Sequence, residues 1–347
     1  MMKRILFVLN DIGGGTAQYQ RLHVESEAVD AYYLQFRGKD FVVTNSSGHV
    51  QIVPAKETNF AEMMQNLSIE EIYVNHFIRF PLGLTMKCIQ ESGIPYVYVA
   101  HDFFCVCPRV YLLNRNSVYC HAEKSESVCQ ICLHGMGRIS IVYWRRLFED
   151  FLAGAVRIIA PSESTKQIIQ SYFPSLIIEV KPHQVPYVKY TYKEEFATAG
   201  NLKIGFIGNI QRHKGSDIVF ALQRAIFAEN LPISLCIIGS TDKKNRDIEA
   251  TGPYKKEDVS SLLQQYRCAL VITASICPET FSYTTHEALG SGYPVIAFNL
   301  GAPAERIYGH GGGWVVNDVN SNSLLQLLKH LLTNRQEIID VAAVIKR

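Results

Sequence analysis

The chain has 347 residues, of which 48% are hydrophobic and 19% charged, and its formal net charge is +2. This composition is typical of a globular protein long enough for two domains, each with its own core. The nearly balanced charge and the lack of a dense Lys/Arg run argue against nucleic acid as a partner. The basic start is followed by too few apolar residues for a signal peptide, and no later segment is apolar enough to span a membrane. We therefore expect a cytoplasmic protein.

Continuous runs of Val, Ile and Leu alternate with amphipathic segments along the chain. Such runs are typical of strands buried on both faces of a parallel sheet. The predicted strands are Ile5–Leu9, Phe41–Val43, Glu71–Val74, Tyr96–Val99, Arg157–Ala160, Ile204–Ile207, Ile233–Ile238, Ala269–Ile272 and Val295–Ala297. The predicted helices between them include Asp217–Glu229, Lys256–Tyr266 and Thr284–Gly290. This alternation predicts an α/β fold of two doubly wound, Rossmann-like domains.

A polar, irregular stretch separates the two halves of this pattern. We place the linker at residues 183–200, the N-terminal domain at residues 1–182 and the C-terminal domain at residues 201–347. Ligands of parallel sheets bind at the carboxyl ends of the strands. Two such domains on either side of a linker therefore predict a central cleft.

Three consecutive glycines, Gly13, Gly14 and Gly15, follow the first predicted strand within the segment Asn10–Thr16. Glycines allow a backbone to approach a ligand closely and to donate N–H groups to it. A tight turn from strand to helix would have the same requirement. The pattern does not match the dinucleotide-binding motif, so it indicates a ligand contact without naming the ligand.

His101 and Asp102 follow the strand that ends at Val99, and so they lie at another carboxyl end. An imidazole at this place could contact a ligand bound at the strand end, and Asp102 could hold the tautomer of the imidazole. A His-Asp pair that only caps a loop is the alternative.

Five of the nine cysteines lie within a loop-like insertion that we place at about residues 103–135. Four of them would make a complete ligand set: Cys107, Cys120, Cys129 and Cys132. The last two have the spacing of a metal knuckle, and four sulfurs suit a tetrahedral, structural zinc ion. A disulfide, free thiols, or replacement of one thiolate by His121 or His134 are the alternatives.

Residues 138–152 mix aromatic and basic side chains at helical spacing. A helix of this kind can pack on a core while its arginines extend to solvent. It can also lie on an anionic membrane surface. We favour the core helix, with peripheral membrane association as the alternative.

The second half opens with a strand that ends at Gly208, followed by Asn209 and a loop that carries Arg212 and Lys214. A helix is predicted from Ser216. The two cations would therefore lie beside the carboxyl end of a strand, where a diphosphate is their natural partner. Two solvated loop cations are the alternative.

Glu279 lies in the loop after the strand Ala269–Ile272, and Glu287 lies in the helix that follows. The backbone N–H groups at the start of that helix, around residues 281–283, form an anion site. A carboxylate on either side of a phosphate site suits a ligand with hydroxyls at both ends, such as a sugar nucleotide. A pair of exposed carboxylates is the alternative.

These segments together resemble the GT-B glycosyltransferases, and specifically the large retaining group called family 4, over nearly the whole chain. Residues 277–297 look like the family's E-x7-E motif and the segment that follows it. Residues 301–305 look like its Gly-rich turn ending in Glu, and residues 208–215 like its donor-phosphate loop. One position departs from the pattern, because Asn209 stands where many members carry Arg.

The resemblance implies a role for each candidate residue of the C-terminal half. Glu279 would contact hydroxyls of the transferred sugar, and Glu287 the ribose. The diphosphate would be held by Arg212 and Lys214 and by backbone N–H groups of the helix start, namely those of Phe281, Ser282 and Tyr283. His101 and Asp102 look like the HD element of bacterial family members and would complete the catalytic set, with His101 at the donor sugar and Asp102 at the acceptor.

The expected function is a retaining glycosyltransferase that uses a UDP-, GDP- or dTDP-sugar without a catalytic metal. The expected acceptor is a polysaccharide or a lipid-linked glycan in bacterial surface-polysaccharide synthesis of the O-antigen or capsule type. A catalytically silent GT-B module that binds glycan or a partner, and a nucleotide-sugar epimerase, are the alternatives. The chain could also be a piece of a larger polysaccharide-assembly protein.

Overall fold

The computed structural model describes residues 2–9, 13–243 and 247–346. The chain divides into two compact units, each with its own sheet. Unit 1 comprises Met1–Val110 and Ala122–Gln184, and unit 2 comprises Tyr111–His121 and Val185–Arg347. The predicted insertion at residues 103–135 is therefore shared, since its middle part belongs with the C-terminal half.

Unit 1 is built on an eight-stranded sheet with the order β4-β3-β2-β1-β5-β6-β7-β8. Its strands are β1 (Arg4–Val8), β2 (Asp30–Arg37), β3 (Asp40–Asn45), β4 (Val50–Pro54), β5 (Glu71–Val74), β6 (Tyr96–Val99), β7 (Arg157–Ala160) and β8 (Glu179–Val180). The pairs from β2 through β1 to β8 are parallel, whereas β3 pairs antiparallel with both β2 and β4. The parallel core was predicted, and the antiparallel extension was not.

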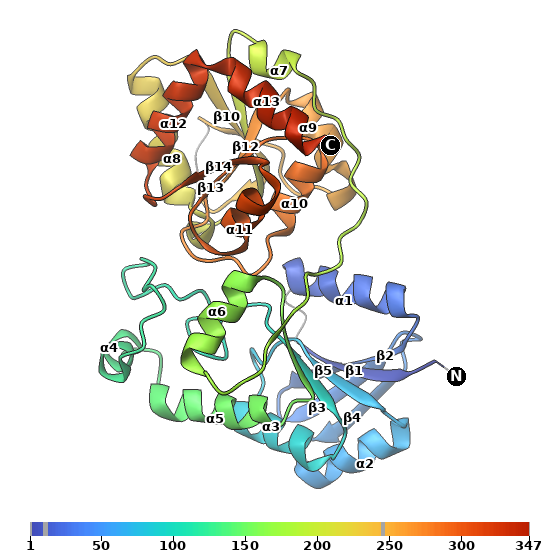
Figure 1. Cartoon of the computed structure of the whole chain (residues 1–347). Helices are drawn as coiled ribbons and strands as arrows, with labels where there is room; N and C mark the ends of the chain where they lie inside the picture. The colour runs from blue at the N-terminus through green and yellow to red at the C-terminus, as the bar shows by residue number, and fades with distance from the viewer. Residues whose placement is uncertain (1, 10–12, 244–246, 347) are drawn as a thin grey trace. The chain divides into compact units, whose positions relative to one another are not determined.

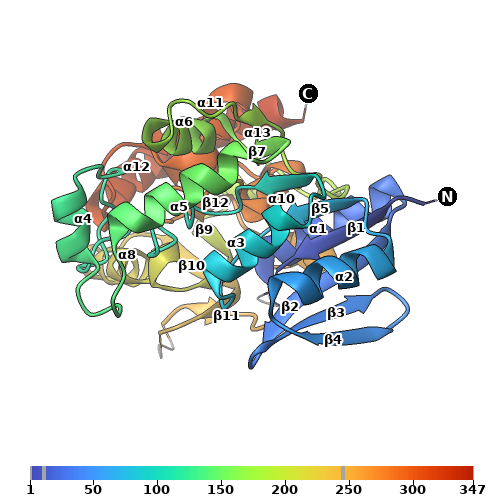
Figure 2. The ribbon, with the colours of Figure 1, turned by 90° about the horizontal axis from the view of Figure 1, so that it is seen from below.

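The helices of unit 1 are α1 (Gly14–Glu27), α2 (Glu57–Leu67), α3 (Leu82–Glu91), α4 (Glu126–Cys132), α5 (Ile141–Ala153) and α6 (Glu163–Tyr172). Figures 1 and 2 show α2, α3 and α5 side by side on one face of the sheet, with α1 on the other. The inner face of α5 is buried at Ile141, Phe148, Phe151 and Leu152. α5 therefore packs as a core helix.

Unit 2 is built on a six-stranded parallel sheet with the order β11-β10-β9-β12-β13-β14. Its strands are β9 (Leu202–Ile210), β10 (Ile233–Thr241), β11 (Glu249–Ala250), β12 (Leu270–Thr273), β13 (Val295–Phe298) and β14 (Gly313–Val316). Its α-helices are α7 (Glu195–Thr198), α8 (Ser216–Ala228), α9 (Val259–Gln265), α10 (Tyr283–Gly290), α11 (Gly301–His310), α12 (Ser321–Thr333) and α13 (Arg335–Ile345). Two 3-10 helices, η1 (Arg212–Lys214) and η2 (Lys256–Asp258), lie between them.

The four central strands of unit 2, β9, β10, β12 and β13, are almost fully buried, as their continuous apolar runs predicted. The ends of β9 and β10 approach so closely that a Cβ at Gly239 would lie 2.1 Å from the carbonyl oxygen of Gly208. Gly239 must therefore be glycine, whereas Gly208 requires glycine because its φ is 110°. In the described part of the chain, none of the helices has the length and apolar character that crossing a membrane requires.

Candidate functional site

The turn between β12 and α10, residues 274–282, places the Glu279 carboxylate against a cation. Its Oε2 atom lies 2.6 Å from Lys214 Nζ, and Ser275 Oγ donates a hydrogen bond to Oε1. Burial alone would raise the pKa of Glu279, but the Lys214 charge and hydrogen bonds from Lys214, Ser275 and Ser282 outweigh it and lower this pKa. Glu279 is therefore ionised at neutral pH.

The backbone of Glu279 is fixed by the start of α11. Glu279 forms a parallel bridge with Gly301, and the Ala302 N–H donates to the Glu279 carbonyl over 2.9 Å. Gly301 has φ 62°, and a Cβ there would lie 2.5 Å from the Glu279 carbonyl oxygen. This close approach requires glycine. Figure 1 shows α10 and α11 at the same end of unit 2.

The turn ends at Ser282, whose backbone is left-handed with φ 62°. Its hydroxyl lies 2.9 Å from Thr285 Oγ1, which in turn lies 3.0 Å from Thr273 Oγ1 at the end of β12. Arg306 Nη1 donates to the Ser282 carbonyl over 3.0 Å. These contacts hold the start of α10, whose first N–H groups have no partner within the helix.

Glu287, on α10, is buried with 4% of its surface exposed. Burial raises its pKa to about 7, against the opposing charge of Lys256 and with a further increase from Glu257. No hydrogen bond from the described part of the chain reaches this carboxylate. The site thus holds two carboxylates with opposite pKa shifts: Glu279 is partly buried and paired with a lysine, and Glu287 is buried without a hydrogen-bond donor from the described residues.

The Glu287→Gln variant is expected to be more stable than the wild type at pH 8. The raised folded pKa means that ionisation of Glu287 destabilises the folded state as pH rises above the unfolded value, and that this cost is complete above about pH 7. The gain is on the order of 3 kcal/mol at pH 8 and close to zero at pH 4.5. Urea denaturation at both pH values would measure it. An equal difference at the two pH values would contradict the assignment.

The loop after β9 carries the two predicted cations, Arg212 and Lys214, but their side chains point to different partners. Lys214 points at Glu279, whereas Arg212 Nε lies 3.6 Å from Asp217 Oδ2, and both side chains of that second pair are more than half exposed. The Asn209 side-chain oxygen accepts a hydrogen bond from Ser240 over 3.1 Å. The structure therefore brings Lys214, and not Arg212, to the Glu279 turn.

The segment Tyr111–His121 also packs in unit 2. The Tyr111 ring stacks on the His213 ring with centroids 4.3 Å apart and an angle of 3° between the planes. His213 lies between the two cations in η1, and burial lowers its pKa. An aromatic residue from the predicted insertion thus supports the loop that carries Lys214.

In unit 1, Asp102 orients a different imidazole from the one that the sequence suggested. Its carboxylate accepts a hydrogen bond from His76 Nε2, and the Ile78 N–H donates to His76 Nδ1 over 2.8 Å. An Nδ1 that accepts carries no proton, so the neutral His76 tautomer has its proton on Nε2. Asp102 thus holds the tautomer of His76.

His101 lies beside Asn75, with 3.1 Å between its Nε2 and the Asn75 side-chain oxygen. Its ring contacts those of Tyr19 and His183, with centroids 4.8 Å and 5.0 Å away. Burial, with the nearby His183 and His76, lowers the pKa of His101 well below its ordinary value. His101 is therefore neutral and can act as a hydrogen-bonding group at pH 7. Its contact with a sugar stays a prediction.

Sequence reasoning missed Asn75, His76 and His183. The first two follow β5 directly, just as His101 and Asp102 follow β6, so the signal that located one pair was also present for the other. His183 stands at the start of the predicted linker and had no such signal.

The glycine-rich turn is only partly described, because residues 10–12 lie outside the described residues. Gly13 and Gly14 have φ 65° and 68°, and a Cβ at either would meet no atom within 4 Å in the described structure. Gly15 lies in the first turn of α1. Gly13 and Gly14 thus serve backbone conformation rather than close packing among the described residues, and a contact of the three glycines with a ligand stays a prediction.

The structure does not support the predicted zinc site. Cys107, Cys120, Cys129 and Cys132 form no disulfide and are partly exposed, and the described residues include no group of three or more His, Cys, Asp or Glu side chains placed to hold a metal. Cys120 belongs to unit 2, whereas the other three belong to unit 1. The spacing of cysteines along the chain therefore does not translate into a tetrahedral cluster.

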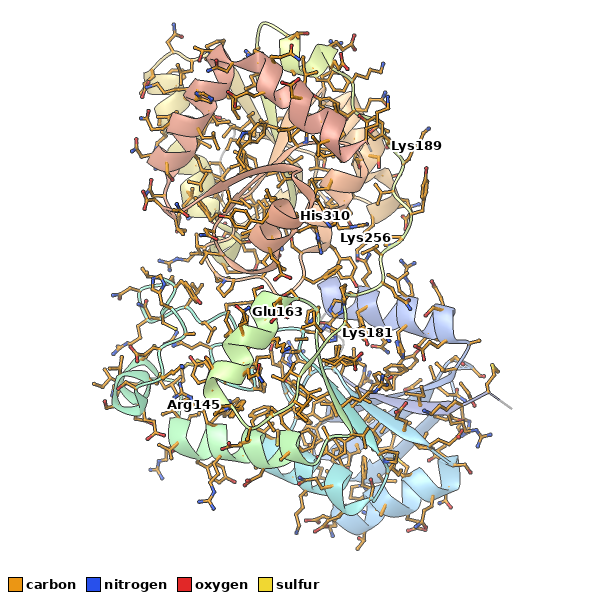
Figure 3. The ribbon with its side chains drawn as sticks, in the orientation of Figure 1. Arg145, Glu163, Lys181, Lys189, Lys256 and His310 are labelled. Atoms are coloured by element: carbon orange, nitrogen blue, oxygen red, sulfur yellow. The ribbon has the colours of Figure 1, made fainter. Side chains whose placement is uncertain are left out.

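An arginine organises the cysteine-rich segment instead. The Arg145 side chain, which Figure 3 shows on α5, donates to Cys129 Sγ over 3.2 Å and to three backbone carbonyls, those of Val106, Glu123 and Lys124. Its guanidinium also lies 4.7 Å from the Tyr172 ring centroid. One basic residue of the predicted amphipathic helix thus faces protein and not a surrounding membrane.

Comparison with known families and structures places these features in context. The model of the family described as glycosyl transferases group 1 matches residues 201–334. No curated protein matches the chain by sequence. The matched residues contain the Lys214 loop, the β12–α10 turn and both glutamates.

Solved structures resemble the chain over almost its entire length. HepE from Anabaena in complex with UDP is 14% identical, with 99% of this chain and 93% of that chain covered and a TM-score of 0.65. Sucrose-phosphate synthase from Thermosynechococcus elongatus is 14% identical, with 99% and 93% covered and a TM-score of 0.64. A glycosyltransferase from Rickettsia africae is 13% identical, with 99% and 93% covered and a TM-score of 0.59. The predicted fold is confirmed: the chain has the GT-B fold, and residues 201–334 match the family model of group 1 glycosyl transferases.

Proposed function

We propose that the protein is a retaining glycosyltransferase of family 4 that takes its sugar from a nucleoside diphosphate. The observation that carries this proposal is the β12–α10 turn, where the ionised Glu279 pairs with Lys214 at the start of α10. The second carboxylate, Glu287, lies on the same helix. Phosphate suits the helix start, and hydroxyls suit the two carboxylates.

The donor occupies unit 2 in this proposal. Glu279 accepts hydrogen bonds from hydroxyls of the transferred sugar, and Glu287 accepts them from the ribose. The ribose hydroxyls supply the donors that the Glu287 carboxylate lacks in the described structure. HepE has been solved with UDP and with UDP-glucose, which supports a UDP-sugar, although GDP- and dTDP-sugars share the same chemistry.

Catalysis follows from charge stabilisation and positioning. The bond between the sugar C1 and the phosphate oxygen breaks, and a bond from C1 to the acceptor oxygen forms on the same face. The acceptor's proton passes to an oxygen of the departing phosphate, so no protein base is required. Lys214 and the first N–H groups of α10 stabilise the developing negative charge without a catalytic metal. Neutral His101 offers a hydrogen bond to the sugar.

The acceptor is chosen by unit 1 in this proposal. A polysaccharide or a lipid-linked glycan of bacterial surface-polysaccharide synthesis is supported by the family resemblance alone. The same resemblance supports a location of the protein in the cytoplasm, at the inner face of the membrane. A membrane association would use exposed apolar side chains of α5, such as Val142 and Tyr143.

A thermal-shift panel of UDP-, GDP- and dTDP-sugars tests the donor site. A true donor at one hundred times its Kd is expected to stabilise the wild type by about 2.7 kcal/mol, and to stabilise Glu287→Ala much less. Glu149→Ala, which removes an exposed carboxylate of unit 1, is the control and should respond like the wild type. If no nucleotide sugar shifts the wild-type midpoint, the proposed function is wrong.

A further inference from the structure

Arg306 is a cation of the candidate site that no motif singled out. It lies on α11, and its Nη1 donates to the Ser282 carbonyl at the end of the β12–α10 turn over 3.0 Å. Its guanidinium also lies 4.6 Å from the centroid of the buried Phe281 ring. Arg306 therefore contacts the two residues whose backbone leads into the start of α10.

The charge of Arg306 is only loosely compensated. Burial lowers its pKa, while the Glu305 and Glu279 carboxylates oppose that change through space. None of the ion pairs in the described part of the chain includes Arg306. A guanidinium has five N–H donors, and the hydrogen bond to Ser282 uses one of them. Half-buried guanidinium groups are normally paired with an anion. The remaining N–H donors of Arg306 are therefore suited to bind an anionic ligand.

The two cations that the sequence assigned to the diphosphate, Lys214 and Arg212, already have carboxylate partners. Lys214 is paired with Glu279 at 2.6 Å, and Arg212 is turned toward Asp217 in solvent. His286 adds no charge, because burial, followed by the charges of Arg306 and His310, lowers its pKa to about 4. A diphosphate at the start of α10 would therefore need a further positive group, and Arg306 is hydrogen-bonded to the turn itself.

We propose that Arg306 is the second cation of the diphosphate site, acting together with Lys214 at the β12–α10 turn. Its planar fork can donate two parallel hydrogen bonds to phosphate oxygens, which an ammonium cannot do. The ligand class is the diphosphate of a nucleoside diphosphate sugar. This inference rests on the proposed function, because it assigns a contact within the same donor site.

Calorimetric titration of the full chain with UDP, UMP and inorganic pyrophosphate tests Arg306. Arg306→Gln is expected to weaken UDP and pyrophosphate binding by roughly ten- to a hundredfold, and UMP binding by less than about threefold. Arg306→Lys keeps the charge without the fork and should restore part of the loss. The control is Arg335→Gln, because Arg335 donates to the carbonyls of Leu332 and Ala197 in the same unit. This control should bind all three probes like the wild type.

The outcomes separate the inference from the proposed function. Wild-type protein that binds neither pyrophosphate nor any nucleoside diphosphate would overturn the function itself. Wild-type binding that Arg306→Gln leaves unchanged would overturn only the role of Arg306. Equal losses for UDP and UMP would show that Arg306 merely supports the turn, which also overturns the inference. If Arg306→Gln does not fold, the ratio of UDP to UMP affinity in Arg306→Lys decides between these results.

Discussion

Replacing Lys214 by methionine is expected to reduce kcat/KM for the nucleotide sugar by roughly 10²- to 10³-fold. In the proposed mechanism the variant loses the ammonium that stabilises the departing diphosphate, and removal of one such electrostatic contact commonly costs about 3–4 kcal/mol of transition-state stabilisation. Methionine keeps much of the volume of the lysine stem. Steady-state kinetics with the donor identified by the thermal-shift panel would measure the loss.

The same substitution should reverse the pH dependence that Glu279 contributes. In the wild type the pKa of Glu279 is lowered, so its contribution to stability is present above the unfolded value and is lost as pH falls through the folded value. Without Lys214 the burial of the carboxylate dominates. The Lys214→Met variant should therefore be less stable by about 1–3 kcal/mol at pH 7 and recover relative to the wild type near pH 4. Denaturation midpoints across this range would show it.

Arg212→Met is the matched control for Lys214→Met, because both residues lie in η1. Arg212 and Asp217 form an exposed pair, and such pairs contribute about 0–1 kcal/mol. We expect this variant to keep its stability and most of its activity. Equal losses of kcat/KM in the two variants would mean that the loop rearranges around the donor, so that Lys214 has no special role.

Replacing Gly301 by alanine is expected to destabilise unit 2 by about 2–4 kcal/mol and to disturb donor binding. Its φ of 62° costs an alanine about 1 kcal/mol, and the new Cβ would lie 2.5 Å from the Glu279 carbonyl oxygen and 2.7 Å from its nitrogen. Relief of that clash must move the backbone of Glu279, and with it the carboxylate. Thermal denaturation and donor titration would detect the two effects.

Gly309→Ala provides the control on the same helix. A Cβ at Gly309 meets nothing within 4 Å in the described structure, and the residue lies inside α11. The alanine should leave donor binding unchanged and raise the unfolding free energy by about 0.5–1 kcal/mol, since alanine favours helix. If Gly301→Ala behaved like Gly309→Ala, the close approach of α11 to Glu279 would be refuted.

The parallel strands could be predicted from the sequence because they are buried on both faces. Glu71–Val74, Tyr96–Val99 and Arg157–Ala160 were located to the residue, since unbroken apolar runs leave little choice. The antiparallel edge of the sheet, formed by β2, β3 and β4, was harder to predict. In β4 exposed and half-buried residues alternate, and β2 carries polar residues among its buried ones. Strands of this kind are stabilised by packing against neighbouring strands, which the residue pattern of a single segment does not reveal.

The candidate site was predictable as far as its parts are close in sequence. Glu279 and Glu287 belong to one local motif, and Lys214 follows a glycine-rich strand end. Arg306 reaches Ser282 only because α11 is tied back to Glu279, a tertiary contact that the sequence does not display. The cysteines show the opposite case. Their spacing along the chain suggested a zinc site, but in the structure Arg145 donates to Cys129 and the four cysteines do not form a cluster.

The packing of Tyr111 on His213 has a consequence for dividing the chain. No single cut separates the protein into two self-sufficient halves, because Tyr111–His121 belongs to unit 2 but is flanked by unit 1. A fragment that starts at Val185 lacks the ring that covers His213, next to Lys214. A chimera that exchanges the C-terminal half between relatives must therefore exchange Tyr111–His121 with it. Otherwise the loop that carries His213 and Lys214 would pack against a residue from the other parent.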